Sequence, residues 1–356
     1  MFKRRAPVGR AVGTVSTVTA LIALAVMAFL PSPFLTQTPG PTFDTLGESS
    51  ENEPIISASD AETFDDDGEL RLLTISLRGN PDNPLTWVEA AAAFVSRDSI
   101  VLPMSSVFGE VSVEERNQQS QADMDDSQQT AIAAALLQMG MAVDSTVTAV
   151  GIVPGSPAEG ILAEGDTLLR VDGVEILDAY TIRAAVAAAD GAVTIEYERE
   201  GTLLQAQIQP EGSSGQRLIG VQAIADVDLP LDVTISLPNV GGPSAGLMFS
   251  LGVIERLTAE SLTGGVAWAG TGTMSVSGQV GSIGGVVQKM HGALDGGVEW
   301  MLVPQDNCGE VSGNVPSGLN VVAVSTLADA VEALEVVADA GGDPDQLVAP
   351  LPSCGR

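Results

Sequence analysis

Lysine is nearly absent from this chain, and its one internal lysine raises the first chemical question. Of the 15 lysines and arginines, only Lys3 and Lys289 are lysines, so arginine serves wherever positive charge alone is needed. Lys289 lies in GSIGGVVQKMHGAL (281–294), among glycines and valines. His291, the only histidine, follows two positions later. A lysine in such surroundings is a candidate proton acceptor.

The neighbours of Lys289 predict that its ammonium group is desolvated. In a helix over 285–297, the residues one turn away from the lysine are small or apolar: Gly285, Val286, Gly292 and Ala293. Desolvation lowers the pKa of lysine, and a lysine that is neutral near pH 7 can take a proton from serine. The alternative is an ordinary surface helix whose lysine extends its ammonium group into water.

The segment GGPSAG (241–246) supplies a serine that such a lysine could activate. Ser244 follows a predicted strand and precedes a predicted helix, where glycines allow the backbone to approach a substrate closely. Backbone amides at a helix start can face a developing oxyanion, and Gly241, Gly242 and Ala245 are the candidates for that role. The alternative is an ordinary serine N-cap after a Gly-Pro turn.

The sequence contains few residues for other kinds of catalytic site. A Ser-His-Asp triad would have to use His291, and a cysteine nucleophile would need that same histidine. Two cysteines and one histidine cannot form a standard zinc site, so we expect no metal and no other cofactor. No Gly-Lys-Ser/Thr sequence occurs, because Met290 follows Lys289, and we expect no ATP binding.

The elements that would position this pair belong to a predicted α/β domain over 228–340. Strands are predicted over 231–240, 298–304 and 319–325, a β-rich segment with tight turns over 266–285, and helices over 241–258, 285–297 and 326–338. Alternating strands and helices favour an α/β or α+β layer architecture. A C-terminal tail follows over 341–356.

A second, β-rich unit is predicted over 141–212. It contains strands, two helical segments and hairpin turns at Asp172-Gly173 and Glu200-Gly201. The run SPAEGILAEGDTLLRVDG (156–173) resembles that of PDZ domains. The resemblance implies a peptide ligand that adds as a strand to a sheet edge, although the family's carboxylate-binding loop is not evident. The alternative is a purely structural linker domain.

The N-terminal part predicts a membrane anchor. A basic segment (1–10) precedes an uncharged run, which predicts a transmembrane signal anchor over 11–31. This arrangement keeps the N-terminus cytoplasmic and the catalytic part outside, in a single-pass protein of the cell membrane. A cleaved signal peptide is the alternative. Residues 32–69, rich in Pro, Ser, Thr, Asp and Glu, predict a juxtamembrane stalk, with an ordered strand entry at PGPTFDTLG (39–47) as the alternative for that stretch.

Between the predicted stalk and the PDZ-like unit, residues 70–140 predict an N-terminal α/β segment that packs with the PDZ or protease unit. A strand is expected over 70–79 and helices over 84–96 and 117–140. The N-cap of the second helix is expected within 125–127.

Charge and cysteine content narrow the partners and the compartment. The net charge of −31 repels phosphate backbones, so nucleic-acid binding is not expected. Cys308 and Cys354 form an even pair in a chain predicted to be exported, which favours a disulfide. This bond would hold the C-terminal tail on the last domain. Two buried free thiols are the alternative.

The order of these motifs resembles the proteolytic domain of Lon-type serine peptidases. PSAG (243–246) matches the family's serine motif, and GQVGSIGGVVQK (278–289) matches its G-x-V-x-x-I-G-G-x-x-x-K element. The resemblance implies Ser244 as the nucleophile and Lys289 as the general base. It also implies that Thr271, in the TG turn before the second motif, hydrogen-bonds the lysine.

The resemblance extends to the arrangement of units, with one departure. An anchor, a PDZ unit and a Lon-like domain together resemble the membrane-anchored PDZ–Lon subgroup, which lacks the ATPase module. Gly241 stands where ATP-dependent Lon proteins carry an aspartate, so regulation through that acid is not implied. The family also implies that a homo-oligomeric ring is feasible.

The sequence therefore predicts an ATP-independent, extracytoplasmic serine endopeptidase. Its expected substrates are flexible or unfolded protein segments, which the PDZ unit recruits or gates. One alternative is a PDZ-based peptide-binding scaffold with an inactive Lon-like domain. Another is a processing enzyme restricted to its own chain, cut within 47–67 or 111–127.

Overall fold

The fold is described from a computed structural model that covers most of the chain. It describes residues 18–20, 22, 25, 26, 28–49, 52–96, 98–109, 111–213, 217–238 and 240–355. The predicted basic segment (1–10) and most of the predicted anchor (11–31) lie outside these residues; 18–20, 22, 25, 26 and 28 are helical. Across the described ranges, no helix has both the length and the apolar character needed to cross a membrane.

The chain divides into two compact units. The first comprises Met1–Pro41 and Thr74–Gln119, and the second comprises Thr42–Leu73 and Ser120–Arg356. Two strands, β1 (Phe34–Asp44) and β3 (Glu69–Arg78), and one helix, α4 (Val113–Gln138), contribute residues to both units.

The first unit is small and lies around the N-terminal part of β1. β4 (Ile100–Pro103) pairs antiparallel with β1, and α2 (Trp87–Phe94) and α3 (Met104–Val107) flank β4 in the sequence. The structure confirms the helix expected over 84–96. A capping box explains where α2 begins, because Thr86 accepts from the Glu89 amide and Glu89 accepts from the Thr86 amide.

The structure corrects two expectations in the N-terminal half. The stalk expected over 32–69 is largely ordered, since it contains β1 and β2 (Ile56–Ala58). β1 lies between β3 and β4 in its sheet, which buries Leu35, Thr36 and Gln37 despite the polar composition of the segment. The N-cap expected within 125–127 is also wrong. The helix begins at Val113, where Ser112 and Glu115 exchange capping hydrogen bonds.

The second unit contains a mixed sheet whose parallel part carries the Lon-like segment. In order, β16 (Asn320–Val324), β15 (Trp300–Pro304), β12 (Ala267–Gly270) and β3 lie side by side and parallel. Helices α6 (Gly246–Leu257), α7 (Val286–Asp295) and α9 (Leu327–Asp339) connect or follow these strands. The expected strand–helix alternation is confirmed.

Shorter elements complete this unit. They are β11 (Val233–Ile235), paired with β2; the β13 (Thr273–Met274) and β14 (Val280–Gly281) hairpin; the short helices η1 (Gln305–Asn307) and α8 (Cys308–Val311); and η2 (Pro344–Gln346) in the tail. The strand expected over 231–240 is thus confined to its centre. The core holds almost all of α6, Trp268 and the C-terminal half of α4. Of the 70–140 segment, residues 70–73 and 120–140 thus belong to this unit, while 74–119 belong to the first.

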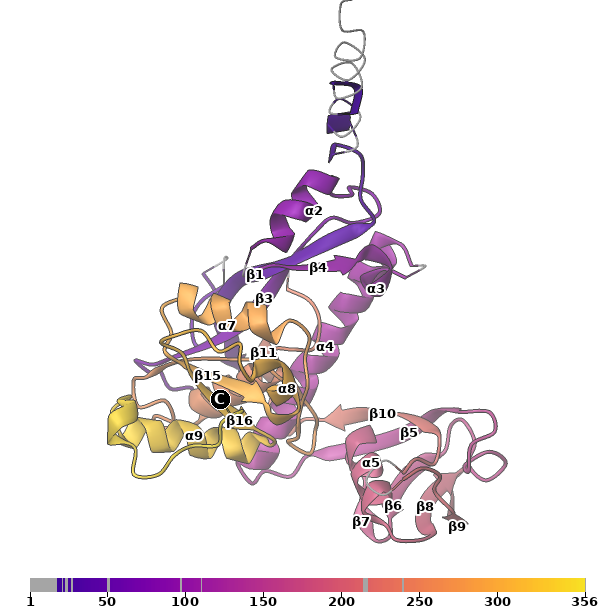
Figure 1. Ribbon diagram of the computed structural model, residues 1–356. Coiled ribbons are helices and arrows are strands. Elements are labelled where there is room, and N and C mark those ends of the chain that lie inside the picture. Colours follow the sequence, from indigo (N-terminus) through magenta and orange to yellow (C-terminus); the bar gives the residue numbers. More distant parts are fainter. Residues whose placement is uncertain are drawn as a thin grey trace, which may run out of the picture. The chain divides into compact units, whose positions relative to one another are not determined.

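A second sheet with its own core forms the β-rich part of this unit (Figure 1). Its strands run in the order β10 (Val221–Asp228), β5 (Asp144–Ile152), β6 (Thr167–Val171), β8 (Val193–Arg199) and β9 (Thr202–Ile208), with β7 (Val174–Glu175) paired to β6. Helix α5 (Ala179–Ala188) lies between β7 and β8 in the sequence. Because β10 pairs with β5, this unit extends past the expected boundary at 212 to Asp228.

The predicted disulfide between Cys308 and Cys354 is present. It ties the C-terminal tail to α8. The tail also lies along β16, where the Ala323 amide donates to the Pro352 carbonyl at 2.9 Å.

Candidate active site

Ser244 is placed by the start of α6. Ala245 occupies the N-cap position of this helix, and Ser244 lies one residue earlier. Ser244 is therefore not the N-cap, which removes the ordinary capping alternative. Gly246 is the first residue of α6. A side chain at this position would clash, because its Cβ would lie 2.9 Å from the Cβ of Met274. The absence of a side chain at Gly246 lets the serine loop approach the β13 hairpin closely.

Lys289 reaches Ser244 from a different element. It lies on α7, whose N-cap Gly285 adopts a left-handed conformation with φ of 73°. Lys289 Nζ lies 2.7 Å from Ser244 Oγ and 2.8 Å from Thr271 Oγ1. The structure thus brings together the predicted nucleophile, the predicted base and the predicted partner of the base.

The turn that holds Thr271 fixes the backbone of Ser244 from one side. The Thr271 hydroxyl donates to the Ser244 carbonyl at 3.1 Å, and the Gly272 amide donates to the same carbonyl at 3.0 Å. In return, the Leu247 amide donates to the Gly272 carbonyl at 3.1 Å. These three bonds tie the serine loop to the end of β12, so the separation of Ser244 and Thr271 is set by backbone contacts.

Burial sets the protonation of Lys289. Only 1% of the residue is exposed, and burial lowers the lysine pKa from 10.5 to about 7. The expected desolvation among small and apolar neighbours is therefore confirmed, and the surface-lysine alternative is wrong. At neutral pH a sizeable fraction of Lys289 is uncharged, which is the form that accepts a proton.

Helix α4 holds the serine loop through hydrogen bonds, a role that the sequence did not predict. The Gly242 amide donates to the Ser120 carbonyl at 2.7 Å, and the Ser127 hydroxyl donates to the Pro243 carbonyl at 3.1 Å. Gly242 was expected as an oxyanion donor, and the structure corrects this: its amide already has an acceptor. Gly241 and Ala245 stay candidates for that role.

Asn307 holds the loop that precedes the lysine helix. Its side-chain oxygen accepts from the Ile283 amide and its side-chain nitrogen donates to the Ile283 carbonyl, both at 2.9 Å. Asn307 is 2% exposed, so both backbone groups of Ile283 are paired inside the protein. A single asparagine between a strand and a short helix gave no sequence signal for this contact.

Glu255 is a second buried group with a strongly shifted pKa, and it lies away from Ser244. Burial, followed by the hydrogen bond with Asp66 and its charge, raises the Glu255 pKa to about 7. Glu255 is near the C-terminal end of α6, about 14 Å along the helix axis from Gly246. Both of its carboxyl oxygens accept from the Leu262 amide. Glu255 therefore stabilises the end of α6 and is no partner of the Ser–Lys pair.

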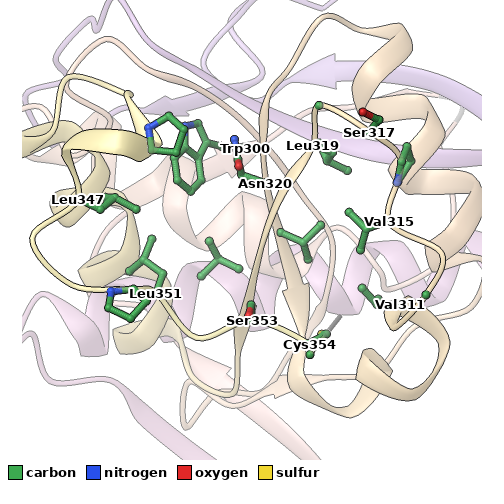
Figure 2. A pocket seen from close by; sticks show the side chains of 18 residues that line it. Trp300, Val311, Val315, Ser317, Leu319, Asn320, Leu347, Leu351, Ser353 and Cys354 are labelled. Atoms are coloured by element: carbon green, nitrogen blue, oxygen red, sulfur yellow. The ribbon is translucent and has the colours of Figure 1, made fainter.

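A cavity beside the C-terminal tail is also separate from Ser244. It has a volume of about 820 Å³ and lies between the tail and β16. Trp300, Leu347 and Leu351 line one side, and Val311 and Val315 line the other (Figure 2). None of its lining residues belongs to the Ser244 site. No group of three or more His, Cys, Asp or Glu side chains among the described residues could hold a metal ion.

Comparison with known proteins supports the resemblance for this segment. Residues 226–336 match the family described as Lon protease (S16) C-terminal proteolytic domain. The chain is 36% identical over 94 residues to the Lon protease of Azospirillum brasilense and 39% identical over 101 residues to Lon protease 2 of Herpetosiphon aurantiacus. These matches cover 26% of this chain but only 11% and 12% of the relatives' length.

Comparison with solved structures concerns the β-rich part. The chain is similar to the PDZ domains of SdrC-like proteins of Listeria monocytogenes and Listeria innocua, with sequence identities of 21% and 22%. Each match covers 22% of this chain, and 85% and 92% of those domains, with a TM-score of 0.20. The resemblance of the β-rich part to PDZ domains rests on the run 156–173.

The match over 226–336, the Ser–Lys contact and the turn around Thr271 concern the same stretch of chain. This chain therefore contains a Lon-type proteolytic domain, the hydrolytic domain of a family of serine peptidases.

Proposed function

We propose that this chain is an ATP-independent serine endopeptidase that uses Ser244 and Lys289 as its catalytic pair. The observation that carries the proposal is the 2.7 Å contact between Ser244 Oγ and a lysine Nζ buried beside it. General-base catalysis requires this reach and a base with a pKa near the working pH. Burial of Lys289 meets the second requirement.

The geometry supports a two-step acyl transfer. Lys289 Nζ takes the hydroxyl proton as Ser244 Oγ attacks the peptide carbonyl, and the resulting ammonium returns the proton to the leaving amine. Water then hydrolyses the ester with the same lysine as base. Thr271 Oγ1 accepts from Nζ and so holds the lysine in line with Oγ. The Gly241 and Ala245 amides are the proposed oxyanion donors.

The proposed substrates are flexible or unfolded protein segments. The chain has no Gly-Lys-Ser/Thr sequence that would cradle a nucleotide phosphate, so its own residues supply no ATP-driven unfolding. Without ATP-driven unfolding, a substrate segment must already be extended to enter a serine peptidase site. An ordered, folded protein is therefore a poor proposed substrate.

The β-rich unit is the proposed peptide-binding module. β10 is the last strand on one side of its sheet, and it lies beside α5. Ile224 on β10 is largely exposed. An extended peptide could add to this edge as a further strand. Because β10 continues through β11 to the Ser244 loop, a peptide bound there would lie on the segment that leads to the nucleophile.

The proposed location is the outer face of the cell membrane. The basic segment 1–10 and the uncharged run 11–31 support a single-pass signal anchor with its N-terminus inside. The disulfide between Cys308 and Cys354 fits an oxidising exterior. A homo-oligomeric ring is a further proposal, which rests only on the resemblance to Lon proteins.

The test is cleavage of an unstructured protein by the full-length chain in lipid vesicles, without ATP, with fragments identified by mass spectrometry. We expect cleavage by the parent and none by Ser244→Ala or Lys289→Ala. Equal cleavage by all three would show that the chemistry is assigned to the wrong residues. Peptide binding without cleavage in the parent would favour a scaffold.

A further inference from the structure

Helix α2 presents an apolar face that no other described element covers. Its large exposed residues are Trp87, Val88, Phe94 and Val95, with exposed fractions of 46%, 47%, 79% and 81%. At about 100° per residue these four lie on one side of the helix. Ala91, also exposed, falls between them, and Ala92 lies next to Val88 at one border of the face. Beyond the other border, next to Phe94, Ala90 is buried and Ala93 is half-buried.

This face is held in place by local contacts. The capping box of Thr86 and Glu89 fixes the first turn of α2. The ring of Trp87 packs edge-on against Phe34, with 5.7 Å between the ring centroids. Trp87 is therefore anchored along one edge and open along the other, which makes its exposure a property of the folded unit.

The exposed face begins where the uncharged N-terminal run ends. The Trp87 amide donates to the Leu30 carbonyl at 3.2 Å, and the Ser32 amide donates to the Leu85 carbonyl at 2.7 Å. Phe29 and Leu30 are themselves exposed. The apolar residues at the end of the run 11–31 thus lie next to the start of α2, although the two segments are far apart in the sequence.

We propose that the exposed face of α2 docks on a lipid bilayer, at the boundary between headgroups and acyl chains. This inference rests on the proposed membrane insertion of residues 11–31. An inserted run ending at Leu30 would bring α2 to the membrane surface through the backbone bonds described above. Exposed tryptophan and phenylalanine are the residue types that favour this boundary.

Charge defines the kind of lipid surface. The chain carries a net charge of −31, and the α2 segment itself carries Glu89 and no basic residue. The nearby Arg78 only offsets Glu89. Attraction to anionic headgroups therefore contributes little to docking, and burial of apolar side chains must account for it. We expect the same docking on vesicles of neutral phosphatidylcholine, with little dependence on salt.

The chain carries its own probe for this contact. Of its three tryptophans, Trp268 and Trp300 are buried in the protease core, and Trp87 is exposed. The experiment reconstitutes the full chain in phosphatidylcholine vesicles whose acyl chains are brominated near the headgroup, which quenches tryptophan at that depth. We expect loss of most of the Trp87 emission, and Trp87→Phe should remove the quenched component.

Substitutions on and off the face provide the matched comparison. The double change Phe94→Glu and Val95→Glu should abolish the lipid quenching of Trp87, because it places charge where acyl chains would lie. Leu203→Glu introduces the same charge at another exposed apolar residue, on β9, and should leave the quenching intact.

Vesicle flotation separates this inference from the proposed anchor. If the chain does not float with vesicles, both the anchor and the docking are wrong. If it floats but Trp87 stays open to acrylamide and unaffected by brominated lipid, only the docking is wrong. Protection of Trp87 that grows with protein concentration in lipid-free detergent would show that a second copy covers the face, and would also overturn the proposal.

Discussion

The Lys289 side chain is 1% exposed in the folded chain, and its amine contacts two hydroxyl groups. Ser244 Oγ and Thr271 Oγ1 both lie within hydrogen-bond distance, and no carboxylate contact with Nζ is found among the described residues. Neutral partners compensate a buried positive charge only in part. Lys289 in the folded chain therefore favours its uncharged form, and two kinds of pH dependence should follow.

The first pH dependence concerns activity. Because the uncharged lysine is the base and its pKa is about 7, kcat/KM should rise with pH through about 7 and then level off. Below the midpoint it should fall about tenfold per pH unit. Lys289→Arg keeps the charge but cannot take up a proton, so it should lose activity by about 10³-fold or more at every pH. A flat profile in the parent would count against this base.

The second pH dependence concerns stability. The lysine pKa is about 7 in the folded chain and near 10.5 in the unfolded chain, so between these values the unfolded chain binds more protons. Stability should therefore rise with pH from about 7 to 10.5, and the cost of the buried charge is greatest below 7. Lys289→Met should exceed the parent in free energy of unfolding at pH 6, and less so at pH 10. Urea denaturation at both values measures this; an equal difference at both contradicts it.

Thr271 offers a test of how the lysine is held. Thr271→Val removes the acceptor of the Nζ bond and the donor to the Ser244 carbonyl. We expect kcat to fall about 10- to 100-fold, with a smaller change in KM, since one or two buried hydrogen bonds are lost. Thr271→Ser retains the hydroxyl and should keep most of the activity. Equal losses in both variants would show that packing of the methyl group matters instead.

The meeting of Ser244, Lys289 and Thr271 could be predicted from the sequence, while their supports could not. Motif order and the resemblance placed these three together, because both motifs occur in contiguous, recognisable runs. Ser120 and Ser127 gave no such signal. They act through single bonds to the backbone of a loop more than 100 residues away, and ordinary helical serines look the same in a sequence.

At the scale of elements, Asn307 is the residue that links η1 to the lysine helix. Asn307→Ala would leave the buried amide and carbonyl of Ile283 without partners. We expect kcat to fall by about tenfold or more, because the 281–285 loop sets the position of α7. Asn307→Asp keeps the acceptor for the Ile283 amide but not the donor, so it should rank between the parent and the alanine variant.

The readout for Asn307 must separate positioning from stability. A shift in the midpoint of the pH–activity profile, measured at a temperature where both variants are fully folded, would mark a displaced Lys289. Reduced unfolding free energy with an unchanged profile and unchanged kcat would show that the asparagine is structural only.

Elements with strong local signals were predicted well, and those without them were not. The helices over 84–96 and 326–338 carry capping boxes and regular apolar spacing. In contrast, β1 contains two prolines and a glycine in a polar sequence, so a strand was only the alternative for 39–47, and pairing within the sheet decides it. The true start of α4 was missed because its first turns are polar and exposed, so apolar periodicity begins only near Met124.

At the scale of the whole molecule, the disulfide between Cys308 and Cys354 closes the C-terminal part of the chain on itself. The two cysteines are 46 residues apart, and closing such a loop stabilises the folded state by about 4 kcal/mol in the chain-entropy description. Replacing both with serine should lower the free energy of unfolding by up to this amount. The parent treated with a reductant should match the double variant, and an unchanged urea midpoint would contradict the prediction.

The position of the tail on β16 has a consequence for solubility. β16 is the last strand on its side of the sheet, and the tail bonds to its outer edge, where the Ala323 amide donates to the Pro352 carbonyl. The Ser312 hydroxyl, at the end of α8, donates to the Gly355 carbonyl and holds the end of the tail. An uncovered strand edge is a template on which other chains can align and aggregate. Because the disulfide holds the tail beside β16, it should also reduce edge-to-edge association between copies of the chain. Colloidal behaviour should change with the redox state of the medium, even where the peptidase site itself is untouched.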